Sequence, residues 1–229
     1  MKPSLPLNLP PELTLVHEDP HLLVLDKPSG LLCVPGRGED KQDCLSARAQ
    51  ARWPEALVVH RLDMATSGLV LMARSPAVQR ALGDAFAEQA VWKRYEAIVD
   101  GVLAEDPHWS VIDAPLMADW PRRPLQKIDP EGKPSVTRWR VLAPLPSLGA
   151  SRLLLEPRTG RTHQLRVHLA SIGHPILGDA LYAEAAVQAR ASRLMLHASV
   201  LQFRHPVDGQ ALRFESPAPF DDAARFRCP

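Results

Sequence analysis

Short apolar runs alternate with polar, proline-containing segments along most of the chain. The runs at 13–17 and 22–25 are separated by a polar Glu-Asp-Pro-His segment, a pattern typical of a β-hairpin. Alternating or unbroken short apolar runs predict further strands. These expected strands lie at 69–73, 94–99, 136–142, 152–155, 200–203 and 211–214, and the last two are expected to form a closing hairpin.

Other segments carry apolar residues at helical spacing. The clearest is 75–89, where Ser75 suits the N-cap, Pro76 suits the first turn, and Val78 and Leu82 begin an apolar face. Further helices are expected at 43–51, at 162–172 with Leu165, Leu169 and Ile172 on one face, and at 183–192.

Two segments have no clear periodicity. Residues 1–12 predict a proline-rich N-terminal arm, and residues 116–134, with four prolines, predict a long loop. Strands and helices are mixed without regular β-α-β alternation, so we expect an α+β fold. The expected organisation is one catalytic domain over 13–229, preceded by the arm.

Composition narrows the class of protein. The 229 residues include 27 basic and 26 acidic side chains, for a net charge of +1, which excludes a uniformly basic nucleic-acid coat protein. The three cysteines, Cys33, Cys44 and Cys228, are too far apart for a metal-binding or disulfide pattern. No signal peptide or membrane-spanning run is present. We therefore expect a cytoplasmic protein without a membrane or metal partner.

A charged tetrad directly precedes the apolar run at 69–73. It consists of His60, Arg61, Leu62 and Asp63. Charge next to a buried strand is costly unless it lies at the strand mouth or is paired. One interpretation is a turn in which Asp63 accepts local hydrogen bonds, including from Thr66 and its neighbours. The other is a functional carboxylate.

The segment RTGRTHQLRVH at 158–168 combines a glycine, threonines and basic side chains before a predicted helix. Thr159 or Thr162 would cap this helix, and its N-terminus would attract an anion. The basic side chains there are Arg158, Arg161, His163 and Arg166. His163 and His168 are five residues apart, which is not the i, i+4 spacing of helical zinc ligands. Arg166 and His168 are equally typical of a solvent-exposed helix face.

A third cluster lies in the proline-rich segment at 116–134. Its members are Trp120, Arg122, Arg123 and Lys127. Cations suit phosphates and an indole suits base stacking, although exposed loops often have this composition without a ligand. The phosphate-binding, dinucleotide-binding and serine-hydrolase motifs GxxxxGK[ST], GxGxxG and GxSxG are absent from the sequence, so those functions have no support.

Taken together, the clusters resemble the RluA-type pseudouridine synthases. The matching motifs follow the family's order: KPxGL at 27–31, HRLDxxTSG at 60–68, KxYxA at 93–97, RTGRTHQLR at 158–166, HPILGD at 174–179 and LHA at 196–198. The resemblance covers about residues 13–220. The segment around Trp120 and the Val34-Pro35-Gly36-Arg37 turn are similar to a short subgroup without an N-terminal S4 RNA-binding domain.

The resemblance implies a fold and a reaction. The fold is a curved, mixed, mainly antiparallel sheet flanked by helices, with a central RNA-binding cleft. The reaction isomerises uridine in RNA to pseudouridine, with no cofactor and no metal. The target base must first be flipped out of its stack.

The resemblance also implies roles for residues. Asp63 matches the essential aspartate, Arg161 the arginine that pairs with it, and Tyr95 the tyrosine that stacks on the target uracil. Whether Asp63 attacks the ribose, attacks the base or removes a ribose proton stays open. Arg61 matches the residue that fills the vacated space. The remaining expected substrate-binding residues are His60, Thr66, Trp120, Arg122, Arg123, Lys127, Arg158, His163, Arg166 and Leu196, although His60 and Leu196 have equally plausible structural roles.

Partners follow from the same resemblance. The short subgroup acts on a tRNA anticodon stem-loop and a 23S rRNA stem-loop, so these are the expected substrates of a monomeric enzyme. One alternative is a non-catalytic RNA-binding or ribosome-assembly factor, against which the presence of Asp63, Tyr95 and Arg161 argues. A metal-dependent hydrolase using His60, Asp63, His163 and His168 is a more distant alternative.

The near-zero net charge hides an uneven distribution. Residues 120–170 hold ten basic and three acidic side chains, a local net charge of +7, whereas the rest of the chain is net negative. A basic stretch of this kind predicts RNA binding that weakens as salt rises.

Overall fold

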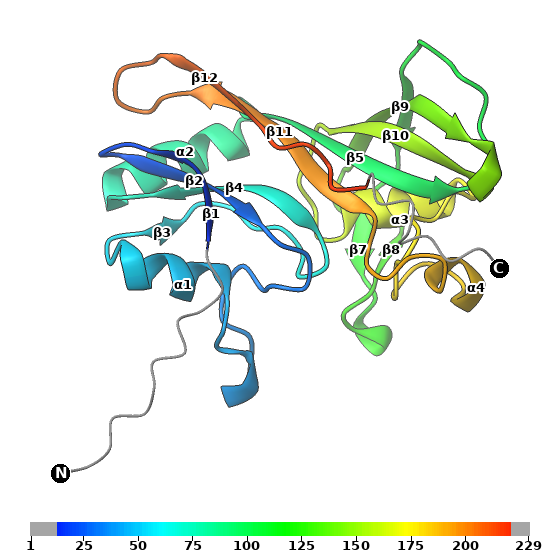
Figure 1. Cartoon of the computed structure of the whole chain (residues 1–229), viewed down its shortest axis with the longest axis horizontal. Helices are drawn as coiled ribbons and strands as arrows, with labels where there is room; N and C mark the ends of the chain where they lie inside the picture. The colour runs from blue at the N-terminus through cyan, green and yellow to red at the C-terminus, as the bar shows by residue number, and fades with distance from the viewer. Residues whose placement is uncertain (1–12, 221–229) are drawn as a thin grey trace.

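The computed structural model describes residues 13–220, so the arm predicted at 1–12 lies outside the described residues (Figure 1). The strands are β1 (Thr14–Glu18), β2 (Leu22–Lys27), β3 (Leu57–Val58), β4 (Ser67–Ala73), β5 (Trp92–Asp100), β6 (Ser110–Asp113), β7 (Leu116–Ala118), β8 (Gln126–Ile128), β9 (Val136–Leu145), β10 (Ala150–Pro157), β11 (Leu196–Arg204) and β12 (Ala211–Glu215). The α-helices are α1 (Leu45–Arg52), α2 (Pro76–Ala87), α3 (Gln164–Ser171) and α4 (Ala185–Gln188). Short 3₁₀ turns lie at Glu39–Lys41, Trp120–Arg122 and Pro146–Leu148.

One large sheet runs through the described chain. Its strand order is β1-β2-β4-β11-β5-β10-β9-β6, with β12 paired to β11 and β3 paired to β4. Strands β4 and β11 run parallel, and the other described pairs are antiparallel. The expected mixed, mainly antiparallel sheet is confirmed. Strand β11 crosses the middle of the molecule and joins the part built on β4 to the part built on β5 (Figure 1).

Gly68 lies where β4 meets β11. It has a φ of +112°, and a Cβ added there would lie 2.4 Å from the carbonyl oxygen of Ala198. A side chain would therefore clash with backbone on the neighbouring strand, and only glycine adopts this conformation at low cost. This explains the glycine that follows Thr66 and Ser67 in the sequence.

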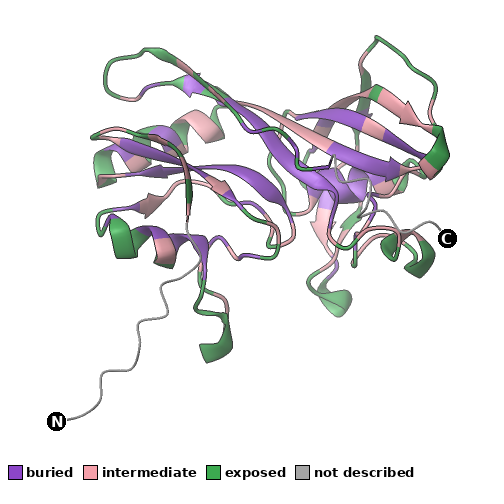
Figure 2. Ribbon diagram, in the orientation of Figure 1, coloured by how far each residue is buried: buried purple, intermediate pink, exposed green. Residues whose placement is uncertain are grey.

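Both faces of strand β4 are buried, and after Ser67 its residues carry no polar side chain. Successive strand side chains point to opposite faces. Val70 and Met72 pack in the cluster that includes Leu45 of α1, whereas Leu69 packs in the cluster that includes Leu82 of α2. Figure 2 shows β4 and β11 as the buried centre of the sheet, with exposed residues at the projecting turns.

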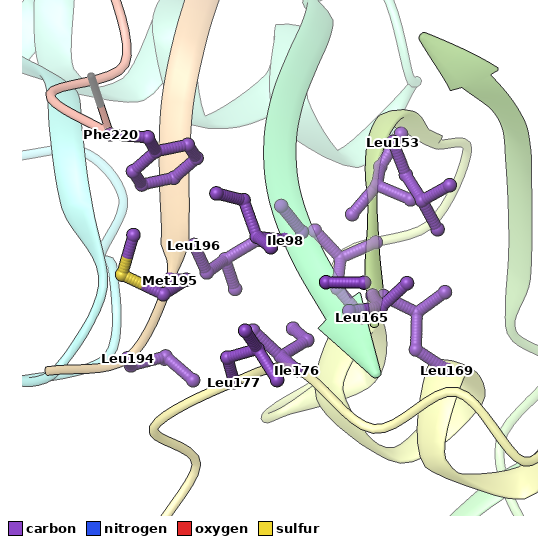
Figure 3. Packing of buried hydrophobic residues seen from close by; sticks show 14 of the residues in the cluster. Ile98, Leu153, Leu165, Leu169, Ile176, Leu177, Leu194, Met195, Leu196 and Phe220 are labelled. Carbon is purple, nitrogen blue, oxygen red and sulfur yellow. The ribbon is translucent and has the colours of Figure 1, made fainter. Parts of the chain in front are cut away.

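A further core lies in the part built on β5. Leu165 and Leu169 of α3 pack with Ile98, Leu153 and their neighbours (Figure 3). The predicted apolar face of α3 is confirmed for the two leucines. Ile172, which we expected on the same face, follows the end of the helix and is exposed.

Several local predictions are confirmed. The Ser75 hydroxyl accepts a hydrogen bond from the Val78 amide and caps α2, with Pro76 at its first position. The hairpins β1–β2 and β11–β12 form as expected.

Other local predictions are wrong. Residues 116–134 contain a β7–β8 hairpin, because Leu116 is buried and anchors it, and the prolines fall outside the paired residues. The helix expected at 183–192 shortens to one turn in α4, since a short helix with little burial is marginal in water. Neither Thr159 nor Thr162 caps α3, whose N-cap is His163 at a φ of 55°.

No helix in the described part of the chain is long and apolar enough to cross a membrane.

Candidate active site

A cleft of about 650 Å³ opens beside the centre of the sheet. It is lined by the loop before β4, the end of α2, one face of β5, and the loop between β10 and α3. Its charged lining residues are Arg61, Asp63, Lys93, Arg158, Arg161 and Arg166. Five of these six are basic, so the cleft attracts anions around a single carboxylate.

Asp63 lies in a turn just before β4. Its main-chain oxygen accepts from the Thr66 amide at 3.1 Å, and this bond closes the turn. Its carboxylate is partly exposed, with Oδ2 lying 3.3 Å from Nη1 of Arg166 and 3.9 Å from Nε2 of His163. The expectation that Thr66 and its neighbours donate to this carboxylate is wrong. Ser67 instead bonds to the ring of His197, 2.9 Å away.

Arg166 is buried and held by a second carboxylate. Its Nε and Nη2 donate to the two oxygens of Asp179 at 2.8 and 2.6 Å, which leaves Nη1 for Asp63. Asp179 also accepts from the amides of Leu181 and Tyr182. Burial opposes the charge of Arg166, but its bonds to Asp179 raise its pKa above the ordinary value. The guanidinium is thus a fixed cation aimed at Asp63.

The predicted pairing of Arg161 with Asp63 is wrong. Arg161 is exposed in the loop before α3, and its Nε donates to the Pro134 carbonyl at 3.2 Å. Arg166 takes the place beside Asp63 because it lies in the first turn of α3, on the side facing the core. The alternative that Arg166 and His168 form a solvated face is excluded as well, since both are buried.

His163 links this ion pair to the β7–β8 hairpin. Its Nδ1 lies 2.7 Å from the hydroxyl of Tyr182, which also accepts from the Gln126 amide at 2.8 Å. Burial lowers the pKa of His163, against the opposing charge of Asp63, and so favours the neutral ring. With the Tyr182 hydroxyl donating to Nδ1, the Nε2–H group faces Asp63.

Tyr95 and Leu196 come from adjacent central strands. Tyr95 lies on β5, lines the cleft and packs against both neighbouring apolar clusters. Burial raises the pKa of its hydroxyl and the charge of Asp63 adds to the rise, so the phenol is neutral. Leu196, at the start of β11, is paired with Ala97 and adds an apolar surface to the cleft.

His60 supports the loop that carries Asp63. Its ring stacks on Phe86 at 4.5 Å, and its Nε2 accepts from the Leu71 amide at 3.0 Å. Burial lowers its pKa to about 3, so the ring is neutral. These contacts favour the structural interpretation of His60 over direct substrate contact.

Sequence reasoning gave no role to Lys27, a buried residue beneath the same loop. Its Nζ donates to the carbonyls of Pro28, Leu31 and Met64 at 2.9, 2.8 and 3.0 Å. Burial lowers its pKa to about 8. Three acceptors match the three donors of an ammonium group, so Lys27 ties the residue after Asp63 to the end of β2. Its signal in the sequence is a lysine that closes an apolar strand.

The third sequence cluster lies outside the lining of the cleft, on the β7–β8 hairpin. Trp120 is 63% exposed, with the Arg123 guanidinium 3.7 Å from the centre of its ring. Arg122 pairs with Asp119, and Lys127 pairs with Asp129. The hairpin projects from the lower edge of the molecule in Figure 1.

The arrangement required for a metal-dependent hydrolase is not formed. Within residues 13–220 no group of histidine, cysteine, aspartate and glutamate side chains is placed to hold a metal ion. His168 bonds to Thr137 and to the Ala114 carbonyl.

Comparisons with known proteins bear on this site. A sequence model of the family described as RNA pseudouridylate synthase matches residues 21–171. A curated relative named dual-specificity RNA pseudouridine synthase RluA, from Escherichia coli (strain K12), is 45% identical over 211 residues, covering 92% of this chain and 95% of the relative. A relative of the same name from Yersinia pestis is 46% identical over 209 residues, covering 91% of this chain and all of the relative.

Solved structures agree with the sequence relatives. Human RNA pseudouridylate synthase domain containing 1 superposes with a TM-score of 0.75 at 30% identity, over 96% of this chain and 87% of that one. Human RNA pseudouridylate synthase domain containing 4 gives a TM-score of 0.72 at 26% identity, over 90% and 89% of the two chains. The chain therefore belongs to the RNA pseudouridylate synthase family, the isomerases that convert uridine in RNA to pseudouridine.

Proposed function

We propose that Asp63 is the catalytic carboxylate and acts directly on a uridine flipped into the cleft. The observation that carries the proposal is the Arg166–Asp63 ion pair in a cleft where the other charged lining residues are basic. Arg166 neutralises and orients the carboxylate, and Asp179 fixes Arg166 in turn. A positioned charge of this kind needs little reorganisation during the reaction.

The flipped base is stacked on Tyr95 and bounded by Leu196. Both side chains line the cleft, and the neutral phenol offers an aromatic face and a hydroxyl close to the carboxylate. Arg61 is exposed at the mouth of the cleft and, within the described residues, makes no hydrogen bond or ion pair. It occupies the space that the uridine leaves in the RNA stack, which offsets part of the few kcal/mol that flipping costs.

RNA outside the flipped nucleotide binds basic and aromatic residues around the cleft. Arg158 and Arg161 are exposed on the loop before α3, and Trp120 and Arg123 lie on the hairpin that Tyr182 connects to His163. Arginine side chains suit phosphates, and a stacked indole–guanidinium pair suits an unpaired base.

The substrates are a tRNA anticodon stem-loop and a 23S rRNA stem-loop, modified in the cytoplasm by a monomer. The support for two RNA classes is the name shared by the curated relatives and the coverage of the matches.

The test is pseudouridine formation in vitro. Unmodified tRNA anticodon and 23S rRNA stem-loops are incubated with the protein, and pseudouridine is mapped in the product. We expect modification of both RNAs and none by Asp63→Asn, which keeps the shape of the side chain without its charge. Activity in Asp63→Asn would exclude the proposed role of Asp63, and modification of one RNA alone would exclude dual specificity.

A further inference from the structure

We propose that Lys93 binds a backbone phosphate of the RNA next to the flipped uridine. The inference rests on the cleft being the RNA site. It assigns a substrate-binding role to a residue for which sequence reasoning gave none.

Within the described residues, Lys93 is a cation without a hydrogen-bond acceptor or an ion-pair partner. It lies on β5, is partly buried and lines the cleft, yet within residues 13–220 its ammonium donates no hydrogen bond and has no carboxylate within 4 Å. The ammonium lies over the ring of Phe86, whose centre is 5.6 Å from Nζ. Burial lowers the pKa of Lys93, and no charged neighbour contributes to the shift.

The ammonium groups of Lys27 and Lys93 differ in their hydrogen bonds. Lys27 is also removed from water, and its three donors are all satisfied by main-chain carbonyls. A buried ammonium that serves only the fold is therefore fully bonded in this protein. Lys93 is only partly buried and bears a smaller cost of desolvation, but its ammonium has none of those bonds, which is the arrangement expected of a group whose acceptor arrives with the ligand.

The position of Lys93 beside Tyr95 indicates that its acceptor is a phosphate of the RNA backbone. Lys93 and Tyr95 are two residues apart on one strand, so their side chains share a face and lie about 7 Å apart. Leu155 on β10 pairs with Tyr95, which places the end of β10, and Arg158 beyond it, alongside this part of β5. A uracil stacked on Tyr95 would thus leave its backbone near Lys93.

Its neighbours hold the lysine in place. The Phe86 ring contacts both side chains: it stacks on His60, with ring centres 4.5 Å apart, and the Lys93 ammonium lies 5.6 Å from its centre. Because these contacts restrict the side chain of Lys93, less side-chain entropy is lost when a phosphate binds. His60 thereby supports the phosphate site as well as the Asp63 loop.

The experiment measures steady-state kinetics and salt dependence on the anticodon stem-loop RNA. The variants are Lys93→Met, which keeps an apolar stem against Phe86, and Lys93→Arg, which keeps the charge. Lys41→Met, an exposed lysine outside both the cleft lining and the basic stretch 120–170, is the matched control. We expect Lys93→Met to raise KM about tenfold with kcat within twofold, and Lys93→Arg to recover most of the loss.

Salt provides a second readout. For Lys93→Met the slope of log(kcat/KM) against log[salt] should be shallower by about 0.7 to 0.9, the value for one lost phosphate contact. Lys41→Met should keep the slope of the unaltered protein. A melting temperature within 2 °C of that protein shows that the lysine does not serve the fold; a larger fall for both Lys93 variants would overturn the proposal.

Two other outcomes would also overturn it. A fall in kcat at unchanged KM that arginine does not rescue would place Lys93 in the chemistry of the base. Unchanged KM and salt slope in Lys93→Met would show that the ammonium meets no phosphate. Failure of the proposed function is distinct, because then the unaltered protein itself would form no pseudouridine in the stem-loop.

Discussion

Arg166 contacts Asp63 through a single nitrogen, Nη1, while its other two donors are committed to Asp179. Asp63 and Arg166 are 103 residues apart in the sequence, and the ion pair joins the loop before β4 to α3. Because Asp179 holds the guanidinium from behind, Arg166 cannot follow a displaced Asp63. The geometry of the carboxylate therefore depends on three residues.

Arg166→Lys should reduce kcat by about 100-fold or more, because one ammonium cannot bond both carboxylates with the geometry of a guanidinium. Single-turnover pseudouridine formation is the appropriate measurement. Arg161→Lys is the matched control and should retain kcat within about threefold, since Arg161 is exposed and away from Asp63. Equal losses in the two variants would contradict this assignment.

Lys27→Met should lower the free energy of unfolding by about 3 kcal/mol, because it leaves three carbonyls without a donor in a buried site. Urea unfolding measures the change. Lys41→Met, at an exposed lysine, should leave stability unchanged within about 0.5 kcal/mol. If Lys27→Met were equally neutral, the three hydrogen bonds would have no net value.

The unfolding free energy should fall as pH drops below 6.5. The pKa of His60 is about 3 in the folded protein and 6.5 in its ordinary state, so the unfolded chain takes up the proton first. At pH 5 the loss from His60 is about 2 kcal/mol. His60→Gln, whose amide oxygen can accept from the Leu71 amide, should flatten the stability profile between pH 6.5 and 5. A profile as steep as that of the unaltered protein would show that other groups cause the fall.

Gly68→Ala should destabilise the protein by about 3 kcal/mol or prevent its folding. The new Cβ meets the backbone of Ala198 and the residue keeps a positive φ. Gly209→Ala is a matched control, because Gly209 also has a positive φ but no atom within 4 Å of the added Cβ. Comparable thermal shifts in both variants would assign the cost to φ alone.

Trp120→Ala should raise KM for the anticodon stem-loop severalfold and leave kcat and the melting temperature unchanged, since the indole is exposed and outside the cleft lining. The control is Val207→Ala, an exposed apolar residue in the β11–β12 turn. Identical KM values in the two variants would remove the hairpin from the RNA interface.

Where side-chain patterns reflect local physics, the sequence predicted the structure well. The Ser75 cap, the strand predicted from the apolar run at 69–73 and the two hairpins depend on neighbours in sequence or on burial, and all appear. The cluster around Asp63 was also found, because charged residues beside a buried strand need a reason.

The choice between Arg161 and Arg166 depended on distant contacts. The helical pattern left a solvent-exposed position open as one interpretation of Arg166, and nothing local indicated that Asp63 and Asp179 would hold its side chain inside the protein. The β7–β8 hairpin escaped prediction for a similar reason. Its proline-rich segment lacks periodicity, and its anchors are Leu116 and the Tyr182 hydroxyl, which is 56 residues from Gln126 in the sequence.

The central position of β11 has a consequence for synthesis of the protein. This strand follows Asp63, Tyr95 and Arg166 in the sequence and is therefore synthesised after them, yet it separates β4 from β5 and so sets the spacing between Asp63 and Tyr95. A nascent chain that ends before Leu196 holds most of the residues proposed for catalysis without the strand that aligns them. The active site therefore cannot form until β11 has been synthesised. A chain truncated within β11 should be inactive although Asp63, Tyr95 and Arg166 are all present.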